Sequence, residues 1–156
     1  MTSEGAMSGQ GRKRTRNGAT EHQEQAALFR WATFAQARWP ELGLLHAIPN
    51  GGQRNKIVAA RLKAEGVRPG VPDLCLPVAR GRWHGLYIEL KALGGRPSKA
   101  QRQWIRALRR QGYRAELCVG WTGARRMIED YLNTGVEAGR RTAVETLPAN
   151  GERSHG

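Results

Sequence analysis

The chain has 156 residues, enough for one domain with tails, and its apolar share of 39% excludes a chain that is disordered throughout. Its formal charge is +13, from 26 Lys and Arg against 13 Asp and Glu, which indicates a polyanionic partner. Residues 20–134 hold 19 of the basic and 9 of the acidic residues, so the excess lies in the part expected to fold. A structured nucleic-acid surface explains this better than a loose basic arm.

Two further features limit the class of protein. Cys75 and Cys118 lie in apolar runs expected to be strands, and two such thiols make neither a disulfide framework nor a zinc site. The chain has no run of about 18 apolar residues, and its polar N-terminus lacks the apolar region of a secretory signal. We therefore expect an intracellular protein with no membrane partner.

The chain divides into a folded region and two tails. Residues 1–19 are rich in Gly, Ser and Arg, and residues 135–156 lack helical periodicity, so we expect a disordered basic N-terminal tail and a flexible C-terminal tail. Thr20 and Gln23 have capping-box spacing, which predicts a helix from residue 20 to about residue 38. The pattern then predicts a strand over 44–48, a loop over 49–54, a helix over 55–66, a hairpin of strands over 71–78 and 83–91, a helix over 98–111, a strand over 113–120 and a helix over 122–132. This order predicts an α/β domain over 20–134, a central mixed sheet flanked by helices.

The predicted hairpin carries three charged side chains. Glu89 and Lys91 are two residues apart on one strand, so their side chains point to the same face of the sheet. Asp73 follows Pro72 near the start of the neighbouring strand. If the two strands pair, Asp73 lies at the same end of the sheet as Glu89 and Lys91. Two carboxylates and an amine then converge.

Buried charges are unfavourable unless they are paired or bind a metal. Mg²⁺ takes oxygen ligands and keeps several waters, and Asp73, Glu89 and the backbone carbonyl of Leu90 are candidate ligands. Lys91 is a candidate to orient or acidify a water, or to offset charge on a pentavalent phosphate. The chemistry is metal-assisted hydrolysis of a phosphodiester. An isolated Glu-x-Lys pair is more often a surface ion pair, but the Pro-Asp step in the same hairpin favours the catalytic interpretation.

These residues resemble a known nuclease family. "GVPDL" followed by "YIELK" looks like the PD-(D/E)XK signature, and "GRPSKAQRQWIRALRRQGY" is similar to its VRR-NUC subfamily, with Ser98, Gln101 and Trp104 on the helix after the hairpin. The loop "IPNGG" and the opening helix "TEHQEQAALFRWA" look like stand-alone phage and bacterial VRR-NUC proteins. The resemblance covers about residues 20–132.

The resemblance implies a restriction-endonuclease-like fold and DNA cleavage that depends on Mg²⁺ or Mn²⁺, with no small-molecule cofactor. It also implies a homodimer that cuts branched DNA, in the manner of Holliday-junction resolvases. The alternative is a basic DNA-binding protein that keeps the fold without catalysis. That alternative explains the charge but not two acids at the strand ends, which would repel phosphate without a cation.

The resemblance also assigns supporting residues. It places Gln101 in the active site, holding Lys91 or a water, although its spacing from Ser98 equally fits a capping box. Related nucleases complete the metal site with a glutamate of the first helix. Glu21 and Glu24 are both candidates, and we favour Glu24 slightly, although the helix dipole alone explains an acid in a first turn.

Polar and basic residues around the site are candidate DNA contacts: Asn50, Gly51, Gln53 and Arg54 in the loop, and Arg96, Ser98, Lys99 and Arg102 at the start of the helix after the hairpin. A glycine loop lets backbone approach a phosphate, and a helix N-terminus attracts one, although a plain turn explains the loop nearly as well. His46 stands alone in an apolar run, so we expect it in the core rather than as a catalytic base.

Overall fold

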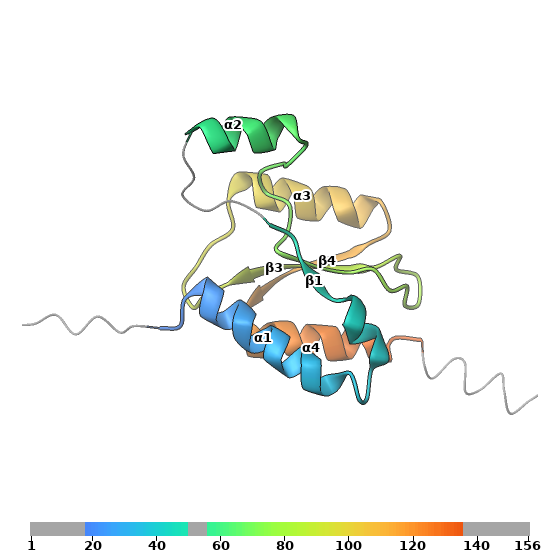
Figure 1. Cartoon of the computed structure of the whole chain (residues 1–156). Coiled ribbons are helices and arrows are strands. Elements are labelled where there is room, and N and C mark those ends of the chain that lie inside the picture. The colour runs from blue at the N-terminus through green and yellow to red at the C-terminus, as the bar shows by residue number, and fades with distance from the viewer. Residues whose placement is uncertain (1–17, 50–55, 136–156) are drawn as a thin grey trace, which may run out of the picture.

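The computed structural model describes residues 18–49 and 56–135 (Figure 1). Most of both predicted tails and of the loop predicted over 49–54 lies outside these residues, so their predicted states remain predictions. The elements, in chain order, are α1 (Glu21–Ala35), the 3-10 helix η1 (Pro40–Leu44), β1 (His46–Ala47), α2 (Lys56–Ala64), β2 (Leu74–Leu76), β3 (Leu86–Lys91), α3 (Lys99–Arg110), β4 (Arg114–Val119) and α4 (Gly120–Asn133).

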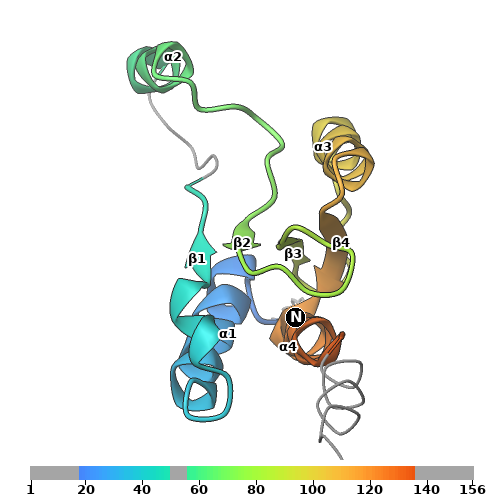
Figure 2. The same ribbon diagram turned by 90° about the vertical axis from the view of Figure 1, so that its right-hand side faces the viewer.

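The sheet has four strands in the order β1-β2-β3-β4. β2 pairs antiparallel with both β1 and β3, whereas β3 and β4 run parallel, with Glu89 beside Leu117 and Lys91 beside Val119. Helices α1 and α4 pack on one face of the sheet and α3 packs on the other (Figures 1 and 2). The predicted mixed sheet flanked by helices is therefore confirmed.

The core lies between the sheet and the pair α1 and α4. It is built from buried apolar side chains of the sheet, of α1 and α4, and of the segments that connect them: Leu28, Ala32, Leu42, Leu45, Leu74, Leu76, Val78, Leu86, Ile88, Leu90, Cys118, Ala124, Ile128, Tyr131 and Leu132. The Tyr131 hydroxyl donates to the Val78 carbonyl at 2.5 Å, which satisfies its polar group inside the core. In β3 every residue except Tyr87 is buried, so the strand carrying Glu89 and Lys91 is covered on both faces.

Three predicted strands are shorter than expected. The run over 44–48 forms only the two residues of β1, because Pro40 begins a 3-10 helix that extends to Leu44. The first hairpin strand ends at Leu76 because Pro77 has no N–H to donate to the ladder. The second begins only at Leu86, behind a turn closed by an isolated bridge between Arg80 and Trp83.

Helix α2 stands apart from the sheet, on the side of β1, whereas α3 lies on the side of β4 (Figure 2). Its apolar face is largely exposed, since Ile57 keeps 76% and Val58 45% of its surface accessible. Leu62 is the partly buried member of that face. Among the helices of the described residues, none is long and apolar enough to cross a membrane.

Candidate active site

The β2–β3 hairpin brings Asp73 and Glu89 together. Leu74 lies opposite Ile88, so Asp73 comes beside Glu89 at the same end of the sheet. The Leu90 amide donates to Asp73 Oδ2 at 2.9 Å, which fixes the half-buried aspartate against β3. Glu89 itself is fully buried, at 0% exposure.

The two carboxylate oxygens of Glu89 have different surroundings. Oε1 accepts from the Lys91 ammonium at 2.9 Å and from the Gln101 side-chain amide. Oε2 is buried and has no hydrogen-bond partner among the described residues. Burial raises the pKa of Glu89 to about 7, against a lowering by the Lys91 hydrogen bond, and the neighbouring Asp73 carboxylate raises it further. The Asp73 carboxylate thus lies beside a fully buried Glu89 carboxyl whose pKa is raised.

Lys91 is held between two acids. Its ammonium lies 2.9 Å from Glu89 Oε1 and 3.3 Å from Glu21 Oε1, and its side chain is 9% exposed. Burial acts to lower the pKa of Lys91, but the contacts with Glu89 and Glu21 outweigh it and the pKa is raised. The residue therefore carries a fixed positive charge at the site.

Gln101 closes the capping box, and its side chain also contacts Glu89 rather than Lys91 or a water. Its side-chain oxygen accepts from the Ser98 amide at 2.7 Å, its backbone N–H donates to the Ser98 hydroxyl at 3.1 Å, and its side-chain N–H donates to Glu89. The capping box that starts α3 thus also aims the amide at Glu89. Because both ends of the side chain are held, the start of α3 fixes the orientation of the glutamate.

The close approach of α3 depends on Gly70. This residue has φ +87°, and a Cβ there would lie 2.7 Å from the Ala100 carbonyl carbon and 2.9 Å from the Gln101 nitrogen. A side chain would push the start of α3 away from the segment that leads to Asp73. Sequence analysis did not single out Gly70, although a glycine two residues before Pro-Asp was visible.

The two glutamates in the first turn of α1 have different contacts. Glu24 Oε2 accepts from the Trp121 amide at 2.7 Å, next to Gly120 at the start of α4. Glu21, on the preceding turn, reaches Lys91 instead. The geometry therefore favours Glu21 over Glu24 as the first-helix acid that joins the site, opposite to the preference drawn from sequence.

The remaining candidates lie around this centre or outside the described residues. Arg96, Ser98, Lys99 and Arg102 are exposed at the start of α3, whereas Asn50, Gly51, Gln53 and Arg54 fall outside the described residues. The Arg102 guanidinium donates to the Pro97 carbonyl at 2.6 Å. The core position expected for His46 is wrong: β1 is an edge strand, and His46 is exposed with Nδ1 3.0 Å from the Leu44 carbonyl oxygen.

The donor set fits a hard divalent cation that keeps part of its water shell. Within the described residues no three His, Cys, Asp or Glu side chains gather as a metal site by themselves. Asp73 and the buried, unpartnered Glu89 Oε2 nevertheless offer two adjacent carboxylate oxygens. One or two carboxylates, several waters and the phosphates of a substrate are the usual ligands of Mg²⁺.

Comparison with known proteins decides the family. The family model of the VRR-NUC domain matches residues 19–121. The chain belongs to the VRR-NUC domain family. A solved structure described as a VRR_NUC domain protein aligns with a TM-score of 0.63 and 31% identity, over 74% of this chain and 90% of that chain. No curated protein matches. The VRR-NUC chain thus has a restriction-endonuclease-like α/β fold and belongs to a family of nucleases, which implies DNA as substrate.

Proposed function

We propose that this VRR-NUC chain is an endonuclease that hydrolyses phosphodiester bonds in branched DNA and requires Mg²⁺ or Mn²⁺. The observation that supports it best is the fully buried Glu89, whose Oε2 lacks a partner while Asp73 lies beside it. Two adjacent carboxylates, one of them fully buried, repel each other unless a proton or a cation joins them. Asp73, Glu89 and the Leu90 carbonyl would hold that cation.

When bound, a divalent cation polarises a phosphoryl oxygen and lowers the pKa of a coordinated water. The chain prepares the site for this chemistry. Gln101 and Lys91 both contact Oε1 of Glu89, which leaves Oε2 as the oxygen that can ligate a cation. The Leu90 amide holds one oxygen of Asp73 in the same way.

Lys91 supplies the positive charge that the transition state requires. Its ammonium is fixed between Glu89 and Glu21, so it does not have to reorganise as negative charge grows on the phosphate oxygens. Exposed Arg96, Lys99 and Arg102 at the start of α3 would hold the neighbouring phosphates. The net positive charge of the folded part favours the approach of DNA.

The preference for branched DNA and a homodimeric state follow from the family resemblance. An isologous dimer carries two equivalent sites related by a two-fold axis, which suits a two-fold symmetric junction. We further propose that the protein acts inside the cell, where such DNA is found.

The test is cleavage of supercoiled plasmid, linear duplex, flap, fork and four-way junction DNA with Mg²⁺, Mn²⁺ or EDTA. We expect cleavage with either metal, none in EDTA, and the highest rate on branched substrates. Asp73→Asn and Glu89→Gln should remain folded and bind DNA without cutting it. Cleavage in EDTA, or full activity of either variant, would refute the mechanism. Equal rates on all substrates would refute the structure selectivity alone.

A further inference from the structure

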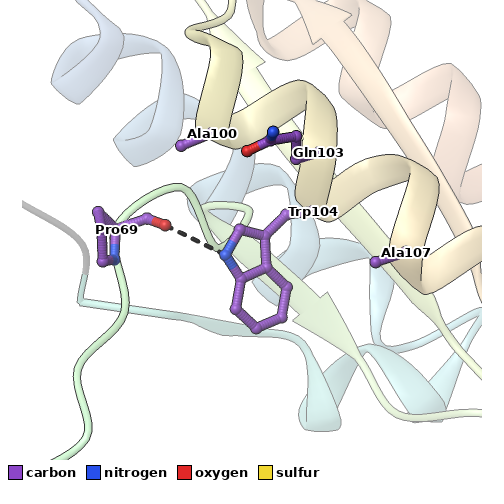
Figure 3. Close-up of a pocket in the computed structure, with 5 residues that line it drawn as sticks. All are labelled: Pro69, Ala100, Gln103, Trp104 and Ala107. Atoms are coloured by element: carbon purple, nitrogen blue, oxygen red, sulfur yellow. Dashed lines mark hydrogen bonds between the residues drawn. The ribbon is translucent and has the colours of Figure 1, made fainter.

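Trp104 of α3 projects into the space between that helix and the segment that leads to Asp73. Figure 3 shows its indole extending from α3 toward Pro69, and the indole N–H donates to the Pro69 carbonyl at 3.1 Å. On one side of the ring lies a hollow of about 400 Å³, lined by Pro69, Ala100, Gln103 and Ala107 as well as Trp104. The indole is half-buried, so it is fixed in place but still accessible.

A second hollow, of about 490 Å³, also has Trp104 in its wall. Ile48, Leu62, Val67, Arg68 and Val71 are among its other lining residues. Its volume falls in the range of small-ligand pockets. The described walls of both hollows contain no acidic residue, and Arg68 is the charged residue among them.

Both hollows adjoin the candidate active site. The Ile48 amide donates to the Asp73 carbonyl at 2.7 Å, and Val71 precedes Asp73 by two residues. Gly70 packs directly on Ala100 and Gln101, and Gln101 holds Glu89. The segment that leads to Asp73 and the start of α3 therefore take part in both the hollows and the carboxylate site.

The walls suit a flat, uncharged aromatic ring with a negatively charged neighbour. The indole offers a stacking surface, apolar side chains surround it, and Arg68 in the wall of the second hollow offers a cation for a linked phosphate. A nucleobase of DNA has these properties. A base inside an intact duplex cannot enter a pocket, because it must first leave the stack.

We propose that the Trp104 hollows bind an unpaired nucleobase next to the scissile phosphate, and that this base makes the nuclease selective for DNA with unpaired nucleotides. The proposal rests on the proposed function, since it concerns the same substrate. The free energy of unstacking is lowest where a branch, a nick or a mismatch has already freed the base. Selectivity for branched structures then arises from one rigid aromatic platform rather than from reading sequence.

The experiment compares affinities in an Asp73→Asn background, so that no DNA is cut. Fluorescence anisotropy measures binding to a fully paired duplex, to the same duplex with a short single-stranded flap, and to that flap DNA with abasic residues at the branch. Trp104→Ala is compared with Trp104→Phe, which keeps an aromatic ring at the same position. Circular dichroism confirms that each variant is folded.

We expect Trp104→Ala to reduce the ratio of flap affinity to duplex affinity by about 5- to 100-fold, the range of one base–aromatic stack, and Trp104→Phe to reduce it far less. Abasic residues should weaken flap binding by the protein that retains Trp104 and should have no further effect on Trp104→Ala. The abasic comparison needs no change at Trp104, so it tests the idea even if Trp104→Ala fails to fold.

Three results would overturn the inference: an unchanged affinity ratio in Trp104→Ala, indifference to abasic residues, or loss of a dimer in sedimentation on changing Trp104. The last result would assign the hollows to a second copy of the chain. Metal-dependent cleavage by the unmodified protein in any of these cases would leave the proposed function standing. If the unmodified protein cuts no DNA but abasic residues still weaken its flap binding, the proposed nuclease activity is refuted and the base-binding site stands.

Discussion

Replacing Gly70 with alanine tests how the start of α3 is brought to the site. Alanine at φ +87° is strained by about 1–2 kcal/mol, and its Cβ would meet the Ala100 and Gln101 backbone at 2.7–2.9 Å. Overpacking of this kind typically adds about 1–3 kcal/mol. We therefore expect Gly70→Ala to lower the free energy of unfolding by about 2–5 kcal/mol, or to displace α3 and separate Gln101 from Glu89.

Gly66 provides the matched control. It has φ +92°, but nothing lies within 4 Å of the position of its Cβ, so Gly66→Ala should show only the backbone strain of about 1–2 kcal/mol. Urea unfolding gives both stabilities, and a plasmid cleavage assay gives both rates. We expect a smaller stability loss for Gly66→Ala than for Gly70→Ala, and a clearly reduced cleavage rate for Gly70→Ala. Equal effects of the two substitutions would contradict the close packing of Gly70 on α3.

Two further predictions concern Glu89 and Gln101. In EDTA, we expect the free energy of unfolding of the unmodified protein to fall by about 2 kcal/mol between about pH 5.5 and pH 8, relative to that of Glu89→Gln. The pKa of the Glu89 carboxyl is raised from 4.5 to about 7. The carboxyl therefore stabilises the fold while it is protonated and loses that contribution as the pH rises through 7. Urea midpoints at the two pH values measure it, and parallel curves for the two proteins would refute it. Gln101→Glu keeps a residue able to close the Ser98 capping box but removes the amide donor to Glu89, so cleavage should slow by about 10- to 100-fold while the helix content measured by circular dichroism is retained. An unchanged rate would show that the contact with Glu89 has no part in activity.

The sequence predicts an element well where its hydrophobic periodicity agrees with the residues that begin and end it. The capping boxes at Thr20 and Ser98 mark the starts of α1 and α3 as expected. Strand ends are predicted less well, because they depend on single backbone groups. Pro77 ends β2, and Pro40 converts the approach to β1 into a 3-10 helix.

The central site follows from local rules, but its surroundings do not. Glu89 and Lys91 share a face because strand side chains alternate, and the hairpin register then places Asp73 beside them. The choice between Glu21 and Glu24 depends on where β4 ends and α4 begins, because the Trp121 amide at that point donates a hydrogen bond to Glu24. No local pattern in the sequence contains that information.

No sequence pattern predicts the Trp104 hollows either. On helical spacing Trp104 belongs to the face of α3 that packs on the sheet, together with Ile105. In the structure Ile105 is buried, but the indole of Trp104 turns to the Pro69 carbonyl. Its position depends on the segment that carries Pro69, and Gly70 lets this segment pack against the start of α3. That packing is a tertiary feature.

Calorimetric titration of the unmodified chain with Mn²⁺ in the absence of DNA tests the central claim most directly. Glu89→Gln removes the unpartnered oxygen, and Glu65→Gln is the control, since that exposed carboxylate, just after α2, pairs only with Arg61 among the described residues. We predict saturable binding by the unmodified protein and by Glu65→Gln, and its loss in Glu89→Gln. Equal binding by all three proteins, or none by the unmodified chain, would contradict the assignment of Asp73 and Glu89 as the cation site.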